Sequence, residues 1–487
     1  MPKRARVAIV NNDDKLNAIM ANAVYVTNPA DDLTVQIQTL TDRYRQLAAG
    51  ATDIRNNLRT YRFSGLTTRQ ALANIEGALK LIQGQIDAKQ ALLVKRQNFA
   101  ARVAVNAAKG QRGDGTCYLH FVNVGLGDCT AISTPSGRTI MIDCGTDSLS
   151  DVILDPDYDP STNIGADTYI ANTIKGKTFL NTGKNIDLLF LTHPDADHHN
   201  KLKTVLGPVR AKIGLVYYGG ADKIEDYAGG TSAYLKQAAG TAASLFRRVT
   251  LSEGAFLDKN KQVVVTRAIN GNPVSKTAGQ AGQLGDEFLD PATGAMVVYY
   301  EQTAKSNFRI SLLAGNVVGA WADGTYALLE SPLKDAREMK LDSTPANRRG
   351  LMVLVECFGA RILICGDGTT VTEKFVVNQF PNVLKGVTIL RMGHHGSPTS
   401  SGQFFLNALG GLTRAVVSTG GENTVLHFLP KQRVLALYGA LPSGAKKHNI
   451  YSFESGDQKS QVYLSNITAW LYATGSNDTI AFPISQS

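Results

Sequence analysis

Hydrophobic residues in the first hundred positions recur at the spacing of amphipathic helices. A first stripe, 33–61, alternates steps of four and three residues, which is the heptad spacing of packed helices. The dipeptide 64–65 interrupts it, and a second stripe follows over 72–93. Thr67 or Thr68 can cap the second helix, because a hydroxyl group there accepts a hydrogen bond from a free backbone amide. The pattern therefore predicts two long helices joined by a short turn.

These two helices are expected to form an antiparallel hairpin. A hairpin buries only one stripe on each helix, so it needs a further surface to cover the rest. We hypothesise that it is an oligomerisation or docking arm, which contacts a second copy of the chain or a partner protein. The polar, glycine-rich segment 109–115 marks a domain boundary, which gives an N-terminal helical domain over 1–112.

From residue 116 onwards, short apolar runs typical of strands alternate with helical patterns and glycine turns. Such alternation predicts an α/β domain with a mixed sheet over 113–487. Residues 220–345 are rich in Gly, Ala, Thr and Asn, and we predict that they form an insertion that decorates the core. The predicted strands are 117–124, 130–133, 139–143, 187–192, 213–218, 351–357, 361–365, 387–392 and 415–418.

The positive charge of the chain lies entirely in its N-terminal segment. The formal net charge is +9, and residues 1–112 hold 17 Lys and Arg against 8 Asp and Glu, so the remainder is balanced. This excess suits a polyanion such as nucleic acid, although an ordinary solvated helix surface explains it equally well. Charge alone does not decide between the two.

Composition also bears on the compartment. The chain has no run of roughly 18 apolar residues and no secretory signal, so we predict no membrane contact. Its five cysteines are odd in number and lack CxxC spacing. They read as small buried residues of a protein in the reducing cytoplasm.

A dense group of potential metal ligands follows the strand predicted at 187–192. His193, Asp195, Asp197 and His198 fall within six residues, and His199 comes next. Strand ends are where α/β sheets build their sites. His193 and Asp195 can reach one metal ion, and Asp197 with His198 can reach a second. Imidazole with carboxylate suits Zn²⁺, and the carboxylate share also suits Mn²⁺.

Two later strands end in the same kinds of residue. Asp367 lies between glycines after the strand 361–365, and His394 with His395 follows the strand 387–392. In concert with the first cluster, Asp367 would bridge two ions. Such a site hydrolyses esters by lowering the pKa of a bound water. The ligand types leave both acyl and phosphoryl esters open.

These motifs resemble the metallo-β-lactamase superfamily, and more narrowly its ComEC-type branch, which includes competence-protein nuclease domains and phosphorylcholine esterases. The resemblance implies an αββα sandwich preceded here by the helical hairpin. The matching stretches, in the family's order, are 121–128 (FxDVGQGD), 139–145 (LIDxG), 193–198 (HPDADH), 347–367 (an Asn, a strand pair, then GD), 393–397 (HHGS) and 423–427 (a closing N…H).

Carried over residue by residue, the resemblance implies two divalent metal ions, Zn²⁺ or Mn²⁺. Asp197, His395 and His427 would be catalytic, with His395 or His427 also able to bind metal. Asp128 and Asp143 would lie beside the ions and orient their ligands. The implied metal ligands are His193, Asp195, Asp197, His198, Asp367 and His394.

The sequence departs from the family pattern in several places. Asn123 and Leu126 replace an Asp and a Gln in the first motif, and Asn200 stands where a Gly is usual. A histidine that many members place between the second motif and the bridging Asp is missing. A mononuclear or inactive variant is therefore an alternative.

The function favoured by these features is that of a metallo-hydrolase acting on a phosphoester, as a phosphodiesterase or nuclease. The alternatives are another hydrolase of the same fold (a phosphorylcholine esterase, a cyclic-nucleotide phosphodiesterase or a lactonase) or a non-catalytic assembly protein with a decayed site.

Overall fold

The structure is a computed structural model of the whole chain, and it divides into two compact units, residues 1–99 and 100–487. Each unit is described by itself. The described residues are 10–23, 33–58, 60–107, 111–147, 152–154, 163–174, 185–207, 213–252, 266–303, 306–317, 319–320, 326–327, 343–419, 428–439, 447–453, 462–468, 471–474 and 480–486.

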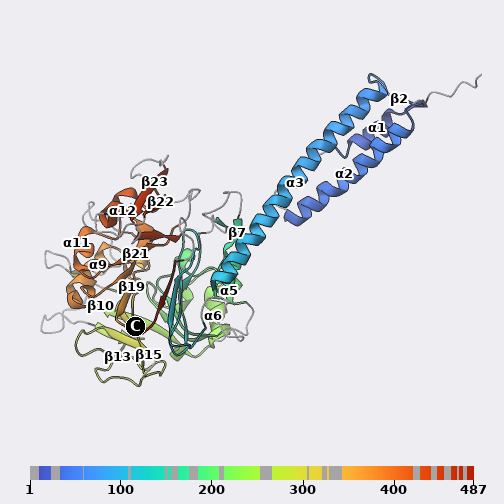
Figure 1. Cartoon of the computed structure of the whole chain (residues 1–487). Coiled ribbons are helices and arrows are strands. Elements are labelled where there is room, and N and C mark those ends of the chain that lie inside the picture. The colour runs from blue at the N-terminus through green and yellow to red at the C-terminus, as the bar shows by residue number, and fades with distance from the viewer. Residues whose placement is uncertain are drawn as a thin grey trace, which may run out of the picture. The chain divides into compact units, whose positions relative to one another are not determined.

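The N-terminal unit is built from long helices, as the heptad pattern indicates (Figure 1). Helix α2 spans Leu33–Asn56 and α3 spans Thr68–Ala107. Arg55 pairs with Glu76 at 2.7 Å, and Lys89 Nζ donates to Gln36 Oε1 at 2.6 Å, so the two chain directions oppose each other. The residues that share the core of this unit are Leu16, Leu40, Leu47, Ala51, Ile54, Phe63, Ala71, Ile75, Ile82 and Ile86.

The ends of these helices are set by local chemistry. Thr67 Oγ1 accepts from the backbone amide of Gln70, and Gln70 Oε1 accepts from the amide of Thr67, which is a capping box. The first predicted stripe, 33–61, extends beyond the helix that it describes. Helix α2 stops at Asn56, and Leu58 is 46% exposed. A short helix, α1 (Asp13–Met20), also packs into the core of this unit.

The second unit is a mixed α/β structure with two large sheets and surrounding helices, which confirms the coarse fold class. Its larger sheet has nine described strands. In spatial order they are β12 (Asn272–Pro273), β11 (Thr266–Ile269), β10 (Phe246–Ser252), β9 (Ile213–Tyr218), β8 (Ile186–Leu191), β5 (Thr139–Cys144), β4 (Cys129–Ser133), β3 (Cys117–Phe121) and β25 (Ile480–Ile484).

The other sheet has eight described strands. It is antiparallel from β13 to β19 and parallel from β19 to β24. In spatial order the strands are β13 (Phe288–Leu289), β14 (Met296–Thr303), β15 (Ser306–Ala314), β18 (Met352–Cys357), β19 (Ala360–Ile364), β20 (Ile389–Arg391), β21 (Arg414–Val417) and β24 (Leu471–Ala473).

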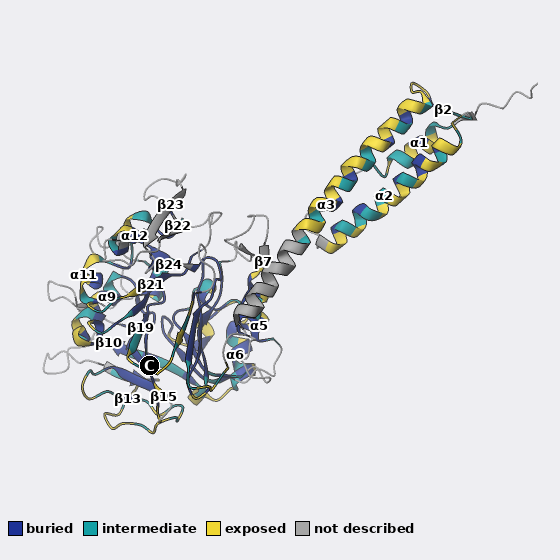
Figure 2. Cartoon of the chain, in the orientation of Figure 1, coloured by how far each residue is buried: buried dark blue, intermediate teal, exposed yellow. Residues whose placement is uncertain are grey.

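One hydrophobic cluster joins the two sheets, since it contains Phe190 of β8, Ile310 of β15 and Leu363 of β19. The sheets therefore face each other across a shared core, drawn dark blue in Figure 2. Helices lie on the outer sides (Figure 1). They are α4 (Ala166–Ile174), α5 (Leu202–Leu206) and α6 (Thr231–Ala239) beside the larger sheet, and α9 (Thr370–Gln379), α10 (Pro381–Leu384), α11 (Gln403–Ala408) and α12 (Gln432–Gly439) beside the other.

The stretch predicted to decorate the core instead helps to build it. Strands β10 and β11 extend the larger sheet, while β13, β14 and β15 form one side of the other. Val249, Met296 and Leu312 from this stretch are fully buried in the shared cluster. Polar turns separate apolar strands such as β14 and β15 in this stretch, and the average composition hides them.

Candidate metal centre

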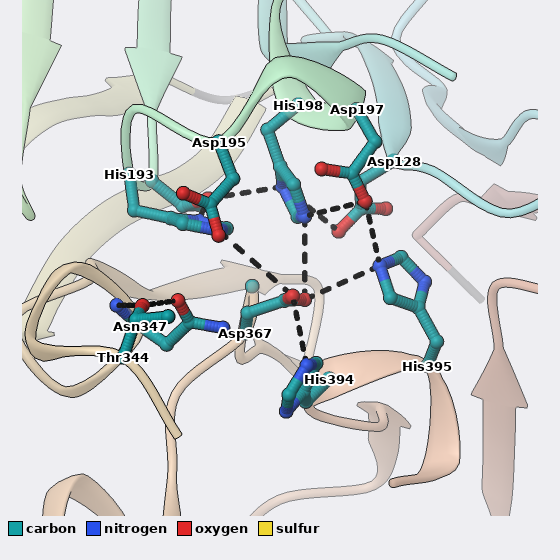
Figure 3. Close-up of polar contacts among 12 residues, drawn as sticks. Asp128, His193, Asp195, Asp197, His198, Thr344, Asn347, Asp367, His394 and His395 are labelled. Carbon is teal, nitrogen blue, oxygen red and sulfur yellow. Dashed lines mark hydrogen bonds and ion pairs between the residues drawn. The ribbon is translucent and has the colours of Figure 1, made fainter. Parts of the chain in front are cut away.

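Histidine and aspartate side chains from both sheets meet where parallel strands end. β5 lies beside β8 in the larger sheet, and β19 lies beside β20 in the other, each pair in parallel. The carboxyl ends of parallel neighbours lie at the same edge. His193 follows β8, Asp367 follows β19, and His394 follows β20, so the loops after these strands converge (Figure 3).

Asp143, the aspartate of β5, fixes the loop that carries residues 193–198. Thr192 donates to it twice, from its backbone amide at 2.8 Å and its hydroxyl at 2.6 Å. His198 Nδ1 donates to the same carboxylate at 2.7 Å. Asp143 is fully buried and has a positive φ of 57°. This side chain therefore orients the His198 ring and leaves Nε2 facing the centre of the cluster.

The carboxylate of Asp367 divides its two oxygens between two groups of side chains (Figure 3). Oδ1 lies 3.3 Å from His198 Nε2 and 3.4 Å from His395 Nε2. Oδ2 lies 3.6 Å from His394 Nε2 and 3.8 Å from His193 Nε2. Each oxygen thus faces two imidazoles from two different loops.

The remaining aspartates complete each group. Asp197 Oδ2 lies 3.4 Å from His395 Nε2 and 3.9 Å from His198 Nε2, on the Oδ1 side of Asp367. Asp195 Oδ2 lies 3.4 Å from His193 Nε2, on the Oδ2 side. The structure therefore brings together all six predicted ligands and His395.

The second histidine loop is strained and held by hydrogen bonds. His394 and His395 both have positive φ, 44° and 52°, a conformation that side chains other than glycine rarely adopt. His395 Nδ1 donates to the carbonyl of Ser418 at 2.8 Å, and His394 Nδ1 lies 2.6 Å from Thr399 Oγ1. Strain of this kind persists only where the surroundings fix it, and it concentrates at functional sites.

The hydrogen bonds of two imidazole rings leave one nitrogen of each ring facing the cluster. His198 and His395 each use Nδ1–H for a carboxylate or a carbonyl, so Nε2 is the atom that carries the lone pair once the ring is deprotonated. Both lone pairs face carboxylate oxygens at 3.3 to 3.4 Å. Two acceptors at this distance require a cation or a proton between them.

The lack of hydrogen-bond partners at these atoms also indicates that they need a cation. His193 Nε2, His198 Nε2, Asp367 Oδ1 and His395 Nε2 are buried, and none has a hydrogen-bond partner among the described residues. Orphaned buried polar atoms are costly and rare in native structures. The residues present therefore fit a metal ion, and two groupings of ligand atoms could hold one through a free Nε2: His193 with His198 and Asp367, and Asp197 with His198 and His395. A third grouping, Asp128 with Asp143 and His198, involves His198 Nδ1, which already donates to Asp143.

The electrostatics of the cluster favour ionised carboxylates. Burial opposes ionisation, but the neighbouring histidines outweigh it and lower the pKa of Asp367 and of Asp197. Burial likewise opposes the charged form of His198 and His395, yet the aspartates raise the pKa of both rings. At His394 burial prevails and lowers the pKa. The carboxylates are thus ready to bind a cation at neutral pH.

Asp128 lies on the far side of His198 and is paired with Arg391, which belongs to none of the sequence motifs. Arg391 is fully buried, and its Nη2 lies 2.6 Å from Asp128 Oδ2. Its Nη1 donates to the carbonyls of Gly366 and Met392 at 2.8 and 2.5 Å. Arg391 therefore connects the first motif to the loops that carry Asp367 and His394.

The glycines of the first two motifs let three loops approach closely. A Cβ atom at Gly145 would overlap the backbone of Asp197 and His198, and one at Gly127 would lie 2.6 Å from the carbonyl of Gly145. The amide of Asp128 also donates to the carbonyl of Asp197 at 3.1 Å. The HPDADH loop therefore rests directly on the backbone of its neighbours.

Two polar residues next to the predicted ligands, Asn200 and His199, hold the loop in place, and a third predicted site residue, His427, is not described. Asn200 Oδ1 accepts from the amide of Thr146, and its Nδ2 donates to the carbonyl of Thr146, so it fastens this loop to the loop after β5. His199 is bound at both ring nitrogens, by Thr231 and by the carbonyl of Pro194. His427, predicted to be catalytic, lies outside the described residues.

Asn347 begins one of the matching stretches, 347–367, but the sequence assigns it no role. It lies in the short helix α8 (Pro345–Arg348), beside His193 and Asp367 in Figure 3. The backbone after α8 is bound to the metal loop, since the amide of Leu351 donates to the carbonyl of Thr192 at 3.0 Å. Its place beside the cluster follows from this tertiary contact.

Comparison with known proteins gives a partial match. No family model matches the chain. A 96-residue segment is 36% identical to ComE operon protein 3 of Bacillus subtilis (strain 168), which is 20% of this chain and 12% of that protein's length. Within the part of the chain that the structure describes, no helix is both long and apolar enough to cross a membrane. The chain is thus similar over a short segment to a ComE operon protein, and its His and Asp groupings can hold metal.

Proposed function

We propose that this chain is a metal-dependent hydrolase of phosphoesters with two divalent ions, Zn²⁺ or Mn²⁺, in a metallo-β-lactamase-type fold. The observation that carries the proposal is the division of the Asp367 carboxylate between two sets of imidazoles. A carboxylate that faces ligands on both of its oxygens is suited to bridge two ions. The partial match to a ComE operon protein and the motif resemblance support the same assignment.

In this proposal each ion takes one histidine of the His394–His395 pair. His193, Asp195, His394 and Asp367 Oδ2 would hold the first ion, and Asp197, His198, His395 and Asp367 Oδ1 the second. His394 then occupies the role of the histidine that the sequence lacks. This argues against the decayed-site alternative.

The ions would supply a water of lowered pKa and polarise the ester oxygen. The protein's own residues prepare the site for this chemistry. Asp143 orients the ring of His198 and Ser418 orients that of His395. Asp367 and Asp197 keep their charge through the neighbouring rings. The catalytic roles proposed for Asp197 and His395 are therefore to hold the reacting water in position and to offset the charge that develops on it.

A phosphodiester, including nucleic acid, is the substrate class that we favour. The 1–112 segment carries the whole net positive charge and could hold a polyanion, while the remainder is neutral. Phosphorylcholine, cyclic nucleotides and lactones are the alternatives, because a two-metal site can act on each of them.

Elemental analysis of the purified protein tests the proposal first. We expect near two equivalents of zinc or manganese, with both lost in a His193→Ala/Asp197→Ala double variant, and hydrolysis of bis(4-nitrophenyl) phosphate lost in Asp197→Ala. One equivalent would indicate a mononuclear site. Absence of metal after reconstitution, or full activity in Asp197→Ala, would contradict the proposal.

We also propose that the N-terminal helices associate with a second copy or a partner protein. Val35 and Leu81 are large, apolar and more than half exposed on α2 and α3. Light scattering on the wild type and a Val35→Lys/Leu81→Lys variant tests this: a dimer that the variant dissociates is expected, and a monomeric wild type with no bound partner would contradict it.

The five cysteines are buried and free, which fits the cytoplasm.

A further inference from the structure

We infer that the side-chain amide of Asn347 binds a non-bridging phosphoryl oxygen of the substrate beside the metal cluster. The inference rests on the proposed phosphoester hydrolase and names a substrate-binding group within that site. It starts from the orientation of one buried side chain, whose exposed fraction is 2%.

The two ends of the Asn347 amide have different surroundings. The hydroxyl of Thr344, the residue that caps α8, accepts from the backbone amide of Asn347 at 3.2 Å and donates to its Oδ1. Oδ1 is thereby held on the side away from the cluster. Nδ2 points toward Asp367 in Figure 3. Although the residue as a whole is buried, this nitrogen is not one of the fully buried, unpartnered atoms of the described residues, so an oxygen of a ligand that enters the site can reach it.

The chemistry of this atom limits what it can bind. An amide nitrogen carries two hydrogens and no available lone pair, so it cannot serve as a metal ligand. It recognises an oxygen. Because the metal cluster next to it would hold the phosphoryl group, the oxygen that reaches Nδ2 is one that the ions leave free.

The support for Asn347 is rigid, which is what a preorganised donor requires. Arg349, two residues later, donates from Nε to Asn316 Oδ1 at 3.0 Å and from Nη2 to Asp222 Oδ1 at 2.6 Å. Its carbonyl accepts from the amide of Gly220, where an added Cβ would lie 2.6 Å from His193 Cβ. The α8 segment is therefore packed, through Gly220, against His193, the first residue of the loop 193–198.

Asn347→Ala and Asn347→Asp test the inference, with bis(4-nitrophenyl) phosphate as substrate and inorganic phosphate as ligand of the metal-loaded protein. We expect kcat/KM to fall roughly 10- to 100-fold in Asn347→Ala, as for loss of one preorganised donor. Asn347→Asp should lose more, because its carboxylate repels the anion. Phosphate affinity, measured by calorimetry, should weaken in both variants while metal content stays at the wild-type value.

Thr344 provides the matched control. Thr344→Ser keeps the hydroxyl and should retain wild-type kinetics and phosphate affinity, whereas Thr344→Val frees Oδ1 and should weaken both. Wild-type phosphate affinity in Asn347→Ala would overturn the inference, and so would loss of metal, since Asn347 would then support the ligands instead. If the wild type cleaves no phosphoester but binds phosphate through Asn347, the inference stands and the proposed function fails. If it binds no phosphate, the inference fails.

Discussion

At the scale of single residues, the cluster depends on charged side chains that do not themselves face the ligand space. Arg391 is the clearest case, because it is the largest fully buried side chain among the described residues and its charge is balanced by Asp128. Burial raises the pKa of Asp128, and Arg391 partly offsets that effect. A buried pair of this kind is costly to break from one side, since the remaining charge has no partner.

We therefore expect Arg391→Met to lower the free energy of unfolding by roughly 3 to 5 kcal/mol at neutral pH. Without Arg391, the pKa of Asp128 rises further above its unfolded value. The folded variant then holds a proton that the unfolded chain has released, so its stability falls as pH rises. The deficit should be largest near neutral pH and shrink as pH falls toward the ordinary pKa of aspartate, about 4. Urea unfolding at several pH values measures it.

Asp128→Asn in the same background serves as the control. In the Arg391→Met/Asp128→Asn double variant, the pH-dependent deficit should disappear, because no buried charge is left alone. An Arg391→Met protein with a deficit independent of pH would show that Arg391 acts by packing alone.

At the scale of elements, the loops that carry the ligands are held together by backbone contacts that only glycine permits. Gly145 follows β5 and touches the backbone of Asp197 and His198, which precede α5. A methyl group there must push the metal loop away from the strand that orients it. The stretch 139–145 therefore requires Gly145 for steric reasons as well as Asp143 for hydrogen bonding.

Gly145→Ala is expected to destabilise the protein by about 1 to 3 kcal/mol through overpacking. It should also lower metal content in the purified protein, because His198 and Asp197 move. The matched control is Gly77→Ala in α3, where nothing lies within 4 Å of an added Cβ. That substitution should stabilise the helix by about 0.5 to 1 kcal/mol and leave metal content unchanged. Equal stability in Gly145→Ala and wild type would contradict the steric argument.

At the scale of the whole molecule, all described members of the cluster belong to the unit 100–487, and the net positive charge belongs to residues 1–112. Each unit has its own hydrophobic core. Chemistry and charge are therefore separated along the chain, which suggests that they can also be separated by experiment.

A chain that begins at residue 111 should retain its metal and hydrolyse bis(4-nitrophenyl) phosphate within a factor of about two of the full chain, since a unit with its own core can fold alone. Its binding to single- or double-stranded DNA should weaken and lose most of its dependence on salt, because fewer cations release fewer counterions. Filter binding at several salt concentrations measures this. Unchanged DNA binding would place the polyanion surface in the catalytic unit.

Local patterning in the sequence determined much of this protein. The stripes at 33–61 and 72–93, the cap at Thr67 and the nine strand runs are all readable because each depends on residues within one element. The ligand candidates are readable for the same reason, since His193, Asp367 and His394 each follow an apolar strand. The end of α2 before Leu58 and the strands within 220–345 are not readable in the same way, because packing rather than pattern decides them.

Only the tertiary structure decided which of these residues meet and in what groups. That Asp367 divides its oxygens, that His394 and His395 face different sides, and that Arg391 and Asn347 take part all depend on contacts between loops that the sequence separates by up to about 260 residues. Spacing along one strand cannot report the distance to another sheet. The sequence determined the ligands as a set, and the packing of two sheets on one core determined their arrangement.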